Sequence, residues 1–254
     1  MFIKYLENIS PENTDKLNEL ICLCDDYEPF FNCNSYHAAA FSDDKKTMTG
    51  FASCILDSYN KSNDTAVYEI TALVAPQYRQ SGLFTRLFNE IKSHISVSHA
   101  DCRFICSMPK ILLKSNLSCG FAFSEHLMTL KHRRTDLNLI NTVSADISNH
   151  YECLFSDDLN NYYVYRNFNE DTEPVALLNI DYQKSFTNVY GVFVDKDLRN
   201  AGLGTFLMTA FIRDYFTEHL NPLVLNVRDS NTPAFHLYKK CGFVTTSHID
   251  YYYI

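Results

Sequence analysis

The chain has 254 residues, enough for one large domain or two of ordinary size, and its 46% hydrophobic and 20% charged residues exclude a disordered chain. No apolar run approaches the roughly 20 residues that span a bilayer, and the N-terminus has no apolar signal core, so we expect a soluble, cytoplasmic protein without a membrane partner. The net charge of −8 disfavours a nucleic-acid partner and weakly supports a cationic or amine-bearing one.

The first half of the chain predicts mixed helices and strands. In chain order we expect a helix over 14–24, hairpin strands over 36–41 and 48–57, a strand over 66–74, a helix from Gly82, a strand over 103–107, a helix near 111–118 and a strand ending at Lys131. Leu83, Leu87 and Ile91 recur at helical spacing after Gly82, which places one apolar face on that helix.

The second half repeats this order with a shorter beginning. The expected elements are strands over 162–166, 175–181 and 188–194, a helix from Leu203, a strand over 223–227, a helix opening at Thr232 and a strand over 243–254. Thr232 is the expected N-cap, with Pro233 at the first helical position, and Gly242 is the expected left-handed stop. Only residues 135–161 remain for the opening elements, so these are expected to be abbreviated.

Nine cysteines are scattered without a repeating spacing. Cys22 and Cys24 lie in a CLC run, and Cys102 and Cys106 are the other close pair. Neither pair is joined to a second pair or to a histidine pair at zinc spacing. We therefore expect free thiols in a reducing compartment and no metal site.

An internal repeat divides the chain into two copies of one domain. The stretch 194-VDKDLRNAGLGTFLM-208 repeats 74-VAPQYRQSGLFTRLF-88, with Phe84 where the later copy has Gly204. A second echo follows each copy in the same order, as CGF at 119–121 and again at 241–243. Two signatures in the same order predict a duplication, with domains over 1–134 and 135–254.

The later copy has the features of a phosphate cradle. A turn from a strand into a helix presents unpaired backbone N–H groups, which attract anions together with the helix dipole. Gly202 and Gly204 let that backbone approach an anion without a Cβ in the way, and Arg199 adds positive charge just before them. Taken alone, the glycines are better explained by a tight turn.

The neighbouring segments decide between these interpretations. RNAGLG, preceded by the strand VYGVFV and followed by 231-NTPAFHLYKKCGF-243, resembles the GCN5-related N-acetyltransferases (GNAT), a large family of acyl-CoA-dependent transferases. The resemblance implies an α/β (α+β) fold of two tandem GNAT-like domains. Each would have a mixed, mostly antiparallel central sheet with a splayed parallel strand pair and flanking helices.

The resemblance also implies a coenzyme site in the second half, with acetyl-CoA as the acyl donor. The residues it implies for the pyrophosphate cradle are Arg199, Asn200, Ala201, Gly202, Leu203, Gly204 and Thr205. Phe193 and Val194 are expected to pair with the pantetheine arm like an added strand and to give the acyl carbonyl a backbone N–H donor. Asn231 matches the asparagine that lies beside the coenzyme.

Tyr238 is the expected catalytic residue. When an amine attacks a thioester, the sulfur leaves as a thiolate, and a phenol beside it can return a proton. The alternative is a tyrosine packed on the helix face with its hydroxyl at the surface. No general base is nominated, because the central strand offers no carboxylate and Asp181, Asp229 and His236 are better explained as solvated or capping residues.

The first half departs from the pattern at the working positions. Phe84 replaces the second cradle glycine, Asn116 replaces the tyrosine, and Pro109 stands where the second half has Asn231. Glu69, on the expected central strand, is the one residue that favours activity there. We therefore expect this half to be degenerate, as a scaffold or a weak coenzyme A site.

Two functions of different class follow. The first is an acyl-CoA-dependent N-acetyltransferase, a monomer or homodimer acting on a small-molecule or peptide amine. The second is a catalytically silent acyl-CoA-binding or interaction protein on the same duplicated fold. An intact Tyr238 favours the enzyme, because a silent module has no need of it.

Overall fold

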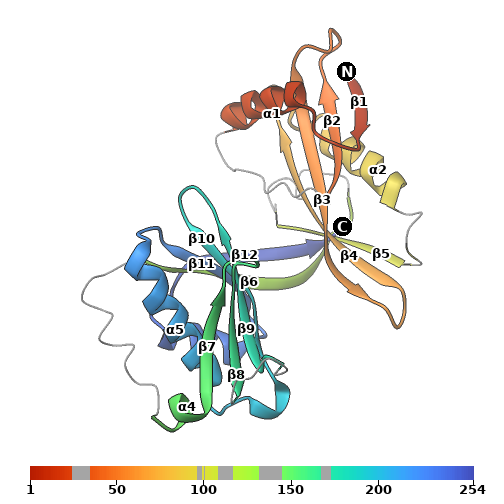
Figure 1. The fold of residues 1–254 in the computed structure, drawn as a ribbon. Helices are drawn as coiled ribbons and strands as arrows, with labels where there is room; N and C mark the ends of the chain where they lie inside the picture. Colours follow the sequence, from red (N-terminus) through yellow and green to blue (C-terminus); the bar gives the residue numbers. More distant parts are fainter. Residues whose placement is uncertain (25–34, 96–98, 100, 108–116, 132–144, 167–172) are drawn as a thin grey trace. The chain divides into compact units, whose positions relative to one another are not determined.

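The structure is a computed structural model that describes residues 1–24, 35–95, 99, 101–107, 117–131, 145–166 and 173–254. The chain divides into two compact units, one of Met1–Phe123 with Asp250–Ile254 and one of Ser124–Ile249 (Figure 1). The boundary expected between residues 134 and 135 lies outside the described residues, and the units divide at two strands instead.

The first unit contains the hairpin and the strand–helix–strand segment expected from the sequence. Its elements are β1 (Phe2–Leu6), α1 (Pro11–Cys24), β2 (Tyr36–Phe41), β3 (Met48–Asn60), β4 (Thr65–Val74), a 3-10 turn (Pro76–Tyr78), α2 (Leu83–Ile95) and β5 (Asp101–Cys106). The sequence analysis missed β1, a five-residue strand that pairs with β2. Most of the helix expected near 111–118 lies outside the described residues, as do Pro109 and Asn116.

The strands of this unit follow the order β1-β2-β3-β4-β5. All these pairs are antiparallel except β4 and β5, which run parallel from Thr65↔Asp101 to Glu69↔Ile105. The end of the chain adds a further antiparallel partner to β5, through Tyr252↔Cys106 and Tyr253↔Ile105.

Helices α1 and α2 lie on either side of β2 and β3 (Figure 1). Alternate residues of a strand face opposite sides of a sheet. Ala38 and Ala40 accordingly join the core cluster under α2, whereas Ala39 and Phe41 join the cluster under α1. Both faces of β2 are therefore buried, and its small side chains let both helices approach.

The second unit contains a short opening segment and then the expected strand–helix order. Its elements are α4 (Ala145–His150), β7 (Tyr151–Ser156), β8 (Asn161–Arg166), β9 (Ala176–Tyr182), β10 (Thr187–Val194), a 3-10 turn (Lys196–Leu198), α5 (Leu203–Glu218), β11 (Leu223–Arg228), α6 (Thr232–Lys240) and most of β12 (Val244–Tyr253). The strand order is β12-β6-β11-β10-β9-β8-β7, where β6 spans Gly120–Leu130.

One face of this second sheet carries the core. Val164, Leu178, Val189 and Leu225 are buried in a cluster with the apolar faces of α5 and α6. The alternate positions of β8 and β9 are partly exposed. In the part of the chain that is described, only α4 and β7 precede β8 in this half.

Each unit is completed by a strand from the other half of the sequence. Residues 124–130 of β6 belong to the second unit, where they pair antiparallel with β11 from Leu223↔Leu130 to Arg228↔Glu125. Residues 250–254 belong to the first unit, where the backbone N–H of Ile254 donates to the carbonyl of Phe104 at 3.0 Å. The predicted fold class is confirmed, with parallel pairing confined to β4/β5 and β10/β11 among the described strand pairs. The two domains are thus not simple consecutive segments.

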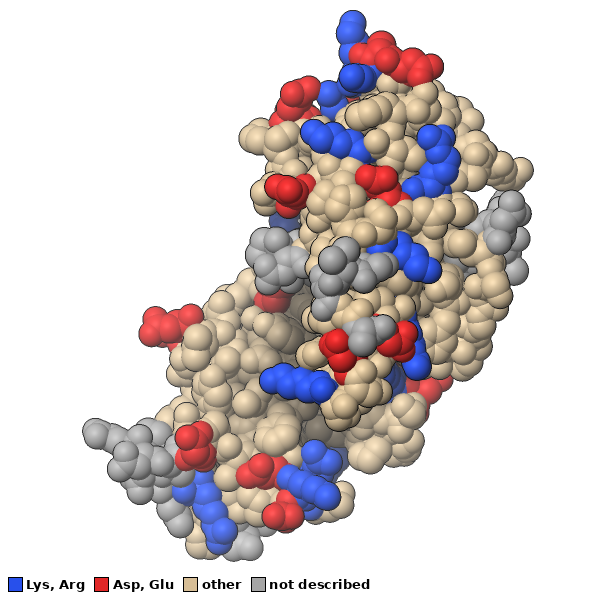
Figure 2. All heavy atoms as spheres, turned by 90° about the vertical axis from the view of Figure 1, so that its right-hand side faces the viewer, with Lys and Arg blue, Asp and Glu red and all other residues tan. Residues whose placement is uncertain are grey.

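The surface and the helices add two observations on partners. On the face in Figure 2, acidic and basic side chains of the described residues are interspersed, without a broad field of one sign. Among the described helices, none combines the length and the apolar character needed to cross a membrane.

Candidate functional site

Strands β10 and β11 separate soon after they begin. Their parallel register contains Thr187↔Leu223 and Asn188↔Val224, and the rest of β10 pairs only with β9 on its other side. In the first unit the corresponding register is longer and ends at Glu69↔Ile105. The splayed pair expected from the resemblance is therefore present, and the opening begins earlier in the second unit.

A bulge in β10 lies within this opening. The register with β9 shifts between Tyr190 and Phe193, and Gly191 has a left-handed φ of 59°. The Asn179 Nδ2 group donates to the carbonyl of Tyr190 at 3.4 Å. A Cβ on Gly191 would lie 2.4 Å from the same Nδ2 atom. Only glycine therefore fits the bulge without displacing Asn179 and straining the backbone.

We expect Gly191→Ala to lower the free energy of unfolding by about 1–3 kcal/mol, because a left-handed conformation is unfavourable for alanine and the Asn179 bond is broken. The matched control is Gly120→Ala, where no atom lies within 4 Å of the added Cβ and φ is not left-handed. Urea unfolding of both variants tests this. Equal stability of the two would contradict the assigned role of the bulge.

The loop after β10 has the same backbone conformation as its copy in the first unit. The φ values of Arg199, Asn200 and Gly202 are −67°, 64° and 89°, and those of Arg79, Gln80 and Gly82 are −65°, 65° and 73°. Both loops lead into a helix whose first N–H groups have no preceding intrahelical acceptor. The geometry that attracts an anion is therefore built in both units.

The two arginines hold these loops closed. Arg199 Nε donates to the carbonyl of Val194 at 3.1 Å, and Arg79 Nε donates to the carbonyl of Val74 at 3.1 Å. Each side chain thus ties the loop to the end of the strand before it. The repeated arginine is explained by this bond, and any contact of Arg199 with a ligand is additional to it.

Position 204 and its copy at 84 face the protein interior. A Cβ on Gly204 would lie 3.0 Å from Leu237 of α6 and 3.8 Å from Val194 of β10. Phe84 is only 6% exposed, and its ring stacks on Phe88 with centroids 6.4 Å apart. The Phe84 side chain therefore packs into the core of the first unit. Glycine at 204 instead lets α5, α6 and the end of β10 meet.

Helix α6 begins and ends with defined caps. Its N-cap is Asn231, whose side chain accepts from the backbone N–H of Ala234 at 3.4 Å, so the assignment of Thr232 as N-cap was wrong by one residue. At the other end Gly242 has a φ of 92°, as expected, and the N–H groups of Gly242 and Phe243 donate to the carbonyls of Lys239 and Tyr238. This is a Schellman motif. It fixes the backbone of Tyr238 through Phe243.

Tyr238 lies in the core of the second unit. It is 7% exposed, and its ring centroid lies 6.0 Å from that of Phe243. Burial, with a smaller contribution from Cys241, raises the pKa of Tyr238 to about 12. The phenol is therefore protonated throughout the neutral range. A packed ring is compatible with both interpretations of Tyr238, the catalytic one and a tyrosine packed on the helix face with its hydroxyl at the surface.

Stability is expected to fall in alkali. Burial raises the pKa of Tyr238, Cys241 and Cys153 to about 12 each, whereas these groups ionise near their ordinary values when unfolded. Their contribution is complete below about pH 8 and is lost as pH rises through the unfolded values, near 9 for the cysteines and 10 for Tyr238, toward 12, with each group adding about 1.4 kcal/mol per pH unit to the slope. Urea midpoints at pH 7.5, 9 and 10.5 should decrease slightly over the first interval and steeply over the second. Cys241→Ala should reduce the slope, and a pH-independent midpoint would contradict the burial argument.

The structure places most predicted site residues around one point. Gly204, at the start of α5, lies against Val194 at the end of β10 and against Leu237 of α6. Leu237 directly precedes Tyr238 in the sequence. Phe193, Asn200, Ala201 and Asn231 are exposed, whereas Leu203 is buried. Val194, Gly202 and Thr205 are partly exposed. Most of the residues predicted to contact the coenzyme are therefore accessible to solvent, whereas Tyr238 is buried.

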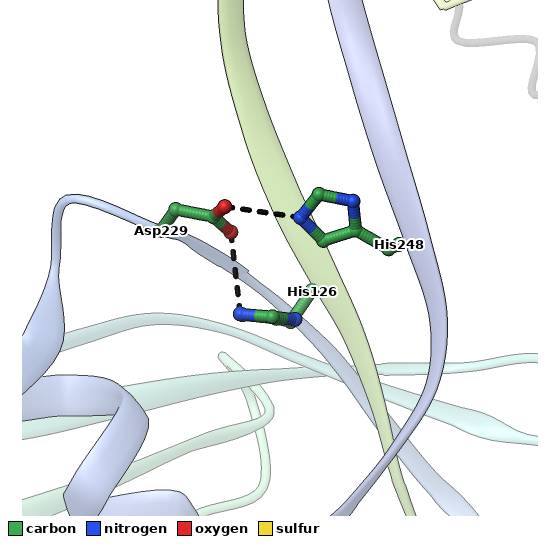
Figure 3. A group of neighbouring side chains, drawn as sticks. All are labelled: His126, Asp229 and His248. Atoms are coloured by element: carbon green, nitrogen blue, oxygen red, sulfur yellow. Dashed lines mark hydrogen bonds and ion pairs between the residues drawn. The ribbon is translucent and has the colours of Figure 1, made fainter.

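Of the possible helper residues, Asp181 accepts from Gln183 Nε2 at 2.6 Å and His236 is exposed. Asp229 contacts His126 and His248, which the sequence analysis did not group with it (Figure 3). The three are widely separated in the sequence, so no local spacing connects them. Their proximity depends on β6 lying beside β11.

Comparison with known proteins agrees with this geometry. Residues 131–243 match the model of the acetyltransferase (GNAT) family. The chain is similar to a tandem GNAT protein from the clavulanic acid biosynthesis pathway, with a TM-score of 0.70 and 11% identity over 100% of this chain and 98% of that one. It is also similar to a GCN5-related N-acetyltransferase from Sphaerobacter thermophilus, with a TM-score of 0.62 and 12% identity over 99% and 95% of the two chains.

A third similar structure is the GCN5-related glucosamine N-acetyltransferase region of a fungal multi-domain GH3 β-N-acetylglucosaminidase. Its TM-score is 0.66 at 9% identity, and the match covers 100% of this chain and 38% of that one. No curated protein sequence matches the chain significantly. At these identities the structural likeness is one of fold.

Proposed function

We propose that this chain, which belongs to the GNAT acetyltransferases and carries two such folds in tandem, transfers an acetyl group from acetyl-CoA to a primary amine in its second unit. The observation that carries the proposal is the meeting of three elements at Gly204. There the anion-attracting loop, the splayed end of β10 and the helix of Tyr238 belong to one compact unit.

The residues fit an acyl-CoA. The backbone N–H groups from Asn200 to Thr205 would hold the pyrophosphate, because this segment contains two left-handed residues and leads into a helix. Phe193 and Val194 would flank the pantetheine arm, since β11 leaves this edge of β10 unpaired beyond Asn188. Asn231 would lie beside the coenzyme at the start of α6. When bound, acetyl-CoA supplies an activated acyl carbonyl.

Tyr238 acts as the proton donor in this proposal. The amine nitrogen forms a bond to the acyl carbon, the carbon–sulfur bond breaks, and the phenol donates to the sulfur as negative charge develops on it. The amine loses its proton to solvent, and water reprotonates Tyr238. A raised pKa suits this role, because the phenol remains a donor at every pH at which the amine is partly neutral.

No carboxylate from β10 serves as general base. Asn188, Val189 and Tyr190 occupy the central part of the strand, so the amine arrives neutral or loses its proton through water. The first unit, which has the same loop conformation, acts as a scaffold or as a second, weaker coenzyme site. Glu69, at the end of the parallel register of β4 and β5, takes no part in transfer in this proposal.

A silent acyl-CoA-binding protein is the second candidate. The burial of Tyr238 favours it, because a tyrosine packed against Phe243 also has a structural explanation. In that case the coenzyme binds but no acceptor is acetylated.

A thiol-release assay with acetyl-CoA separates the two functions. The amine panel should include glucosamine, small polyamines, amino acids and peptides with free N-termini or lysines, and coenzyme binding should be measured in parallel by calorimetry. Release that depends on an amine supports the enzyme. Binding without release for every amine supports the silent module, and absence of binding contradicts both. Size-exclusion chromatography tests the expected monomer or homodimer.

A further inference from the structure

Three side chains with metal-ligating atoms meet on the second unit. His126 comes from β6, Asp229 follows β11 directly, and His248 comes from β12. The Nε2 atoms of His126 and His248 lie 3.3 and 3.0 Å from the two carboxylate oxygens of Asp229. Figure 3 shows both imidazoles facing the carboxylate from either side.

The ligand atoms of these residues lie close enough together for one ion to contact all three after small movements. One ligand atom from each residue lies within 4.8 Å of the other two. Ligands about 2.0–2.2 Å from a tetrahedral zinc ion are separated by roughly 3.3 Å, which is close to the two distances above, although these run to different oxygens of Asp229. A divalent ion can therefore replace the bridging protons with small adjustments of the side chains.

The chemistry of the donors selects the class of ion. Imidazole suits zinc, copper, nickel and iron, whereas magnesium and calcium prefer sites made of oxygen alone. Two histidines and one aspartate leave a fourth tetrahedral position for water. The side chains of Asp229 and His248 are 44% and 47% exposed, so an ion reaches them from solvent.

The surroundings hold the first ligand in place. The ring of His126 packs on Phe235 of α6 with centroids 4.6 Å apart, and its Nδ1 atom is buried without a hydrogen-bond partner among the described residues. Nε2 is thus the atom that it presents to an ion. An ion pair of Arg228 with Glu125, at 3.6 Å, lies on the residues next to Asp229 and His126 in the paired strands.

The three ligands come from adjacent strands of different origin. Strand β6 comes from the first half of the sequence and pairs with β11, and on its other side Thr246 of β12 donates to the carbonyl of Leu127 at 3.2 Å. Hydrogen bonds already join these strands, and a bound ion would add a cross-link between them. Such a link would stabilise the insertion of β6 into the second sheet.

We propose that His126, Asp229 and His248 form a binding site for a transition-metal ion of the zinc class, which fastens β6 to β11 and β12. The site differs from the expectation of no metal site, which was based on local cysteine and histidine spacing. It is independent of the transferase chemistry proposed above.

The test uses the full chain, freed of metal by chelation and then titrated with zinc or cobalt. Zinc should raise the thermal midpoint of the wild type, and one equivalent of cobalt should give d–d absorption without sulfur-to-cobalt charge transfer. Asp229→Asn and His248→Ala should weaken binding at least about tenfold. His236→Ala is the matched control, an exposed histidine of the same unit outside the cluster, and should bind as the wild type does.

Three outcomes overturn the proposal. The first is the absence of any zinc-dependent shift in the wild type. The second is a shift that survives unchanged in both ligand variants. The third is a charge-transfer band that assigns the ion to cysteines such as Cys22 or Cys119, which are exposed. The thermal shift does not depend on acetyl transfer, so its result is separate from the test of the proposed activity.

Discussion

Tyr238→Phe is expected to lower kcat for acetyl transfer by about 10²-fold or more while leaving acetyl-CoA binding nearly unchanged. The substitution keeps the buried ring beside Phe243 and removes only the hydroxyl that is proposed to donate to the departing sulfur. A loss confined to kcat identifies an interaction made in the transition state. Steady-state kinetics with a thiol reagent, together with calorimetric binding, measure the two effects separately.

Tyr215→Phe is the matched control for this experiment. Tyr215 is a second buried tyrosine of the same core, and its hydroxyl bonds to Thr187 at 2.7 Å and to the carbonyl of Asn221 at 3.3 Å. Its loss should cost about 1 kcal/mol of stability and leave kcat unchanged. If Tyr238→Phe behaves in the same way, the hydroxyl of Tyr238 is structural and the catalytic assignment is wrong.

A fragment of residues 135–254 is expected not to fold, because it lacks the strand that completes its sheet. Residues 124–130 of β6 pair along β11 and bury Met128 completely. Losing a buried methionine alone costs about 2–5 kcal/mol, a large part of the roughly 5–15 kcal/mol that holds a domain together. A fragment of residues 120–254 retains β6 and should fold. Circular dichroism and urea unfolding distinguish them, and a stable, active 135–254 fragment would contradict the strand exchange.

The reciprocal deletion affects the other unit. Removing residues 250–254 takes away the antiparallel partner of β5, including the pairs of Tyr252 and Tyr253 with Cys106 and Ile105. The first unit should then become the more easily cleaved part of the chain, although the deletion is at the opposite end of the sequence. Limited proteolysis with mass spectrometry would show which unit is cut first.

Local features were predicted best from the sequence. Gly202 and Gly242 were expected at a turn and a helix stop, and both have left-handed conformations that glycine adopts readily. The strand–helix order of the second half was also predicted, from the periodicity of its apolar residues. Each of these features depends on residues only a few positions apart.

Features that depend on distant contacts were missed. Residues of β6 complete the sheet of the second unit and the end of β12 completes that of the first. The sequence of a single strand does not indicate which sheet it will join, so this exchange was not predicted. The burial of Phe84 was not predicted, because it depends on how α2 packs on the sheet. The two CGF sequences, at 119–121 and 241–243, also differ in backbone conformation, because Gly242 is left-handed and Gly120, at the start of β6, is not. His126, Asp229 and His248 were missed because the exchange brings them together.

The most direct test of the account is a calorimetric titration of acetyl-CoA into the wild type and two matched variants, Ala201→Asp and Ser81→Asp. Both positions are exposed and equivalent in the two loops, and an acidic residue before a helix start is compatible with folding. Repulsion of about 1.4 kcal/mol at the pyrophosphate would weaken binding about tenfold. We predict that loss for Ala201→Asp and little change for Ser81→Asp. Binding that withstands Ala201→Asp and is lost in Ser81→Asp would place the coenzyme in the first unit and contradict the account.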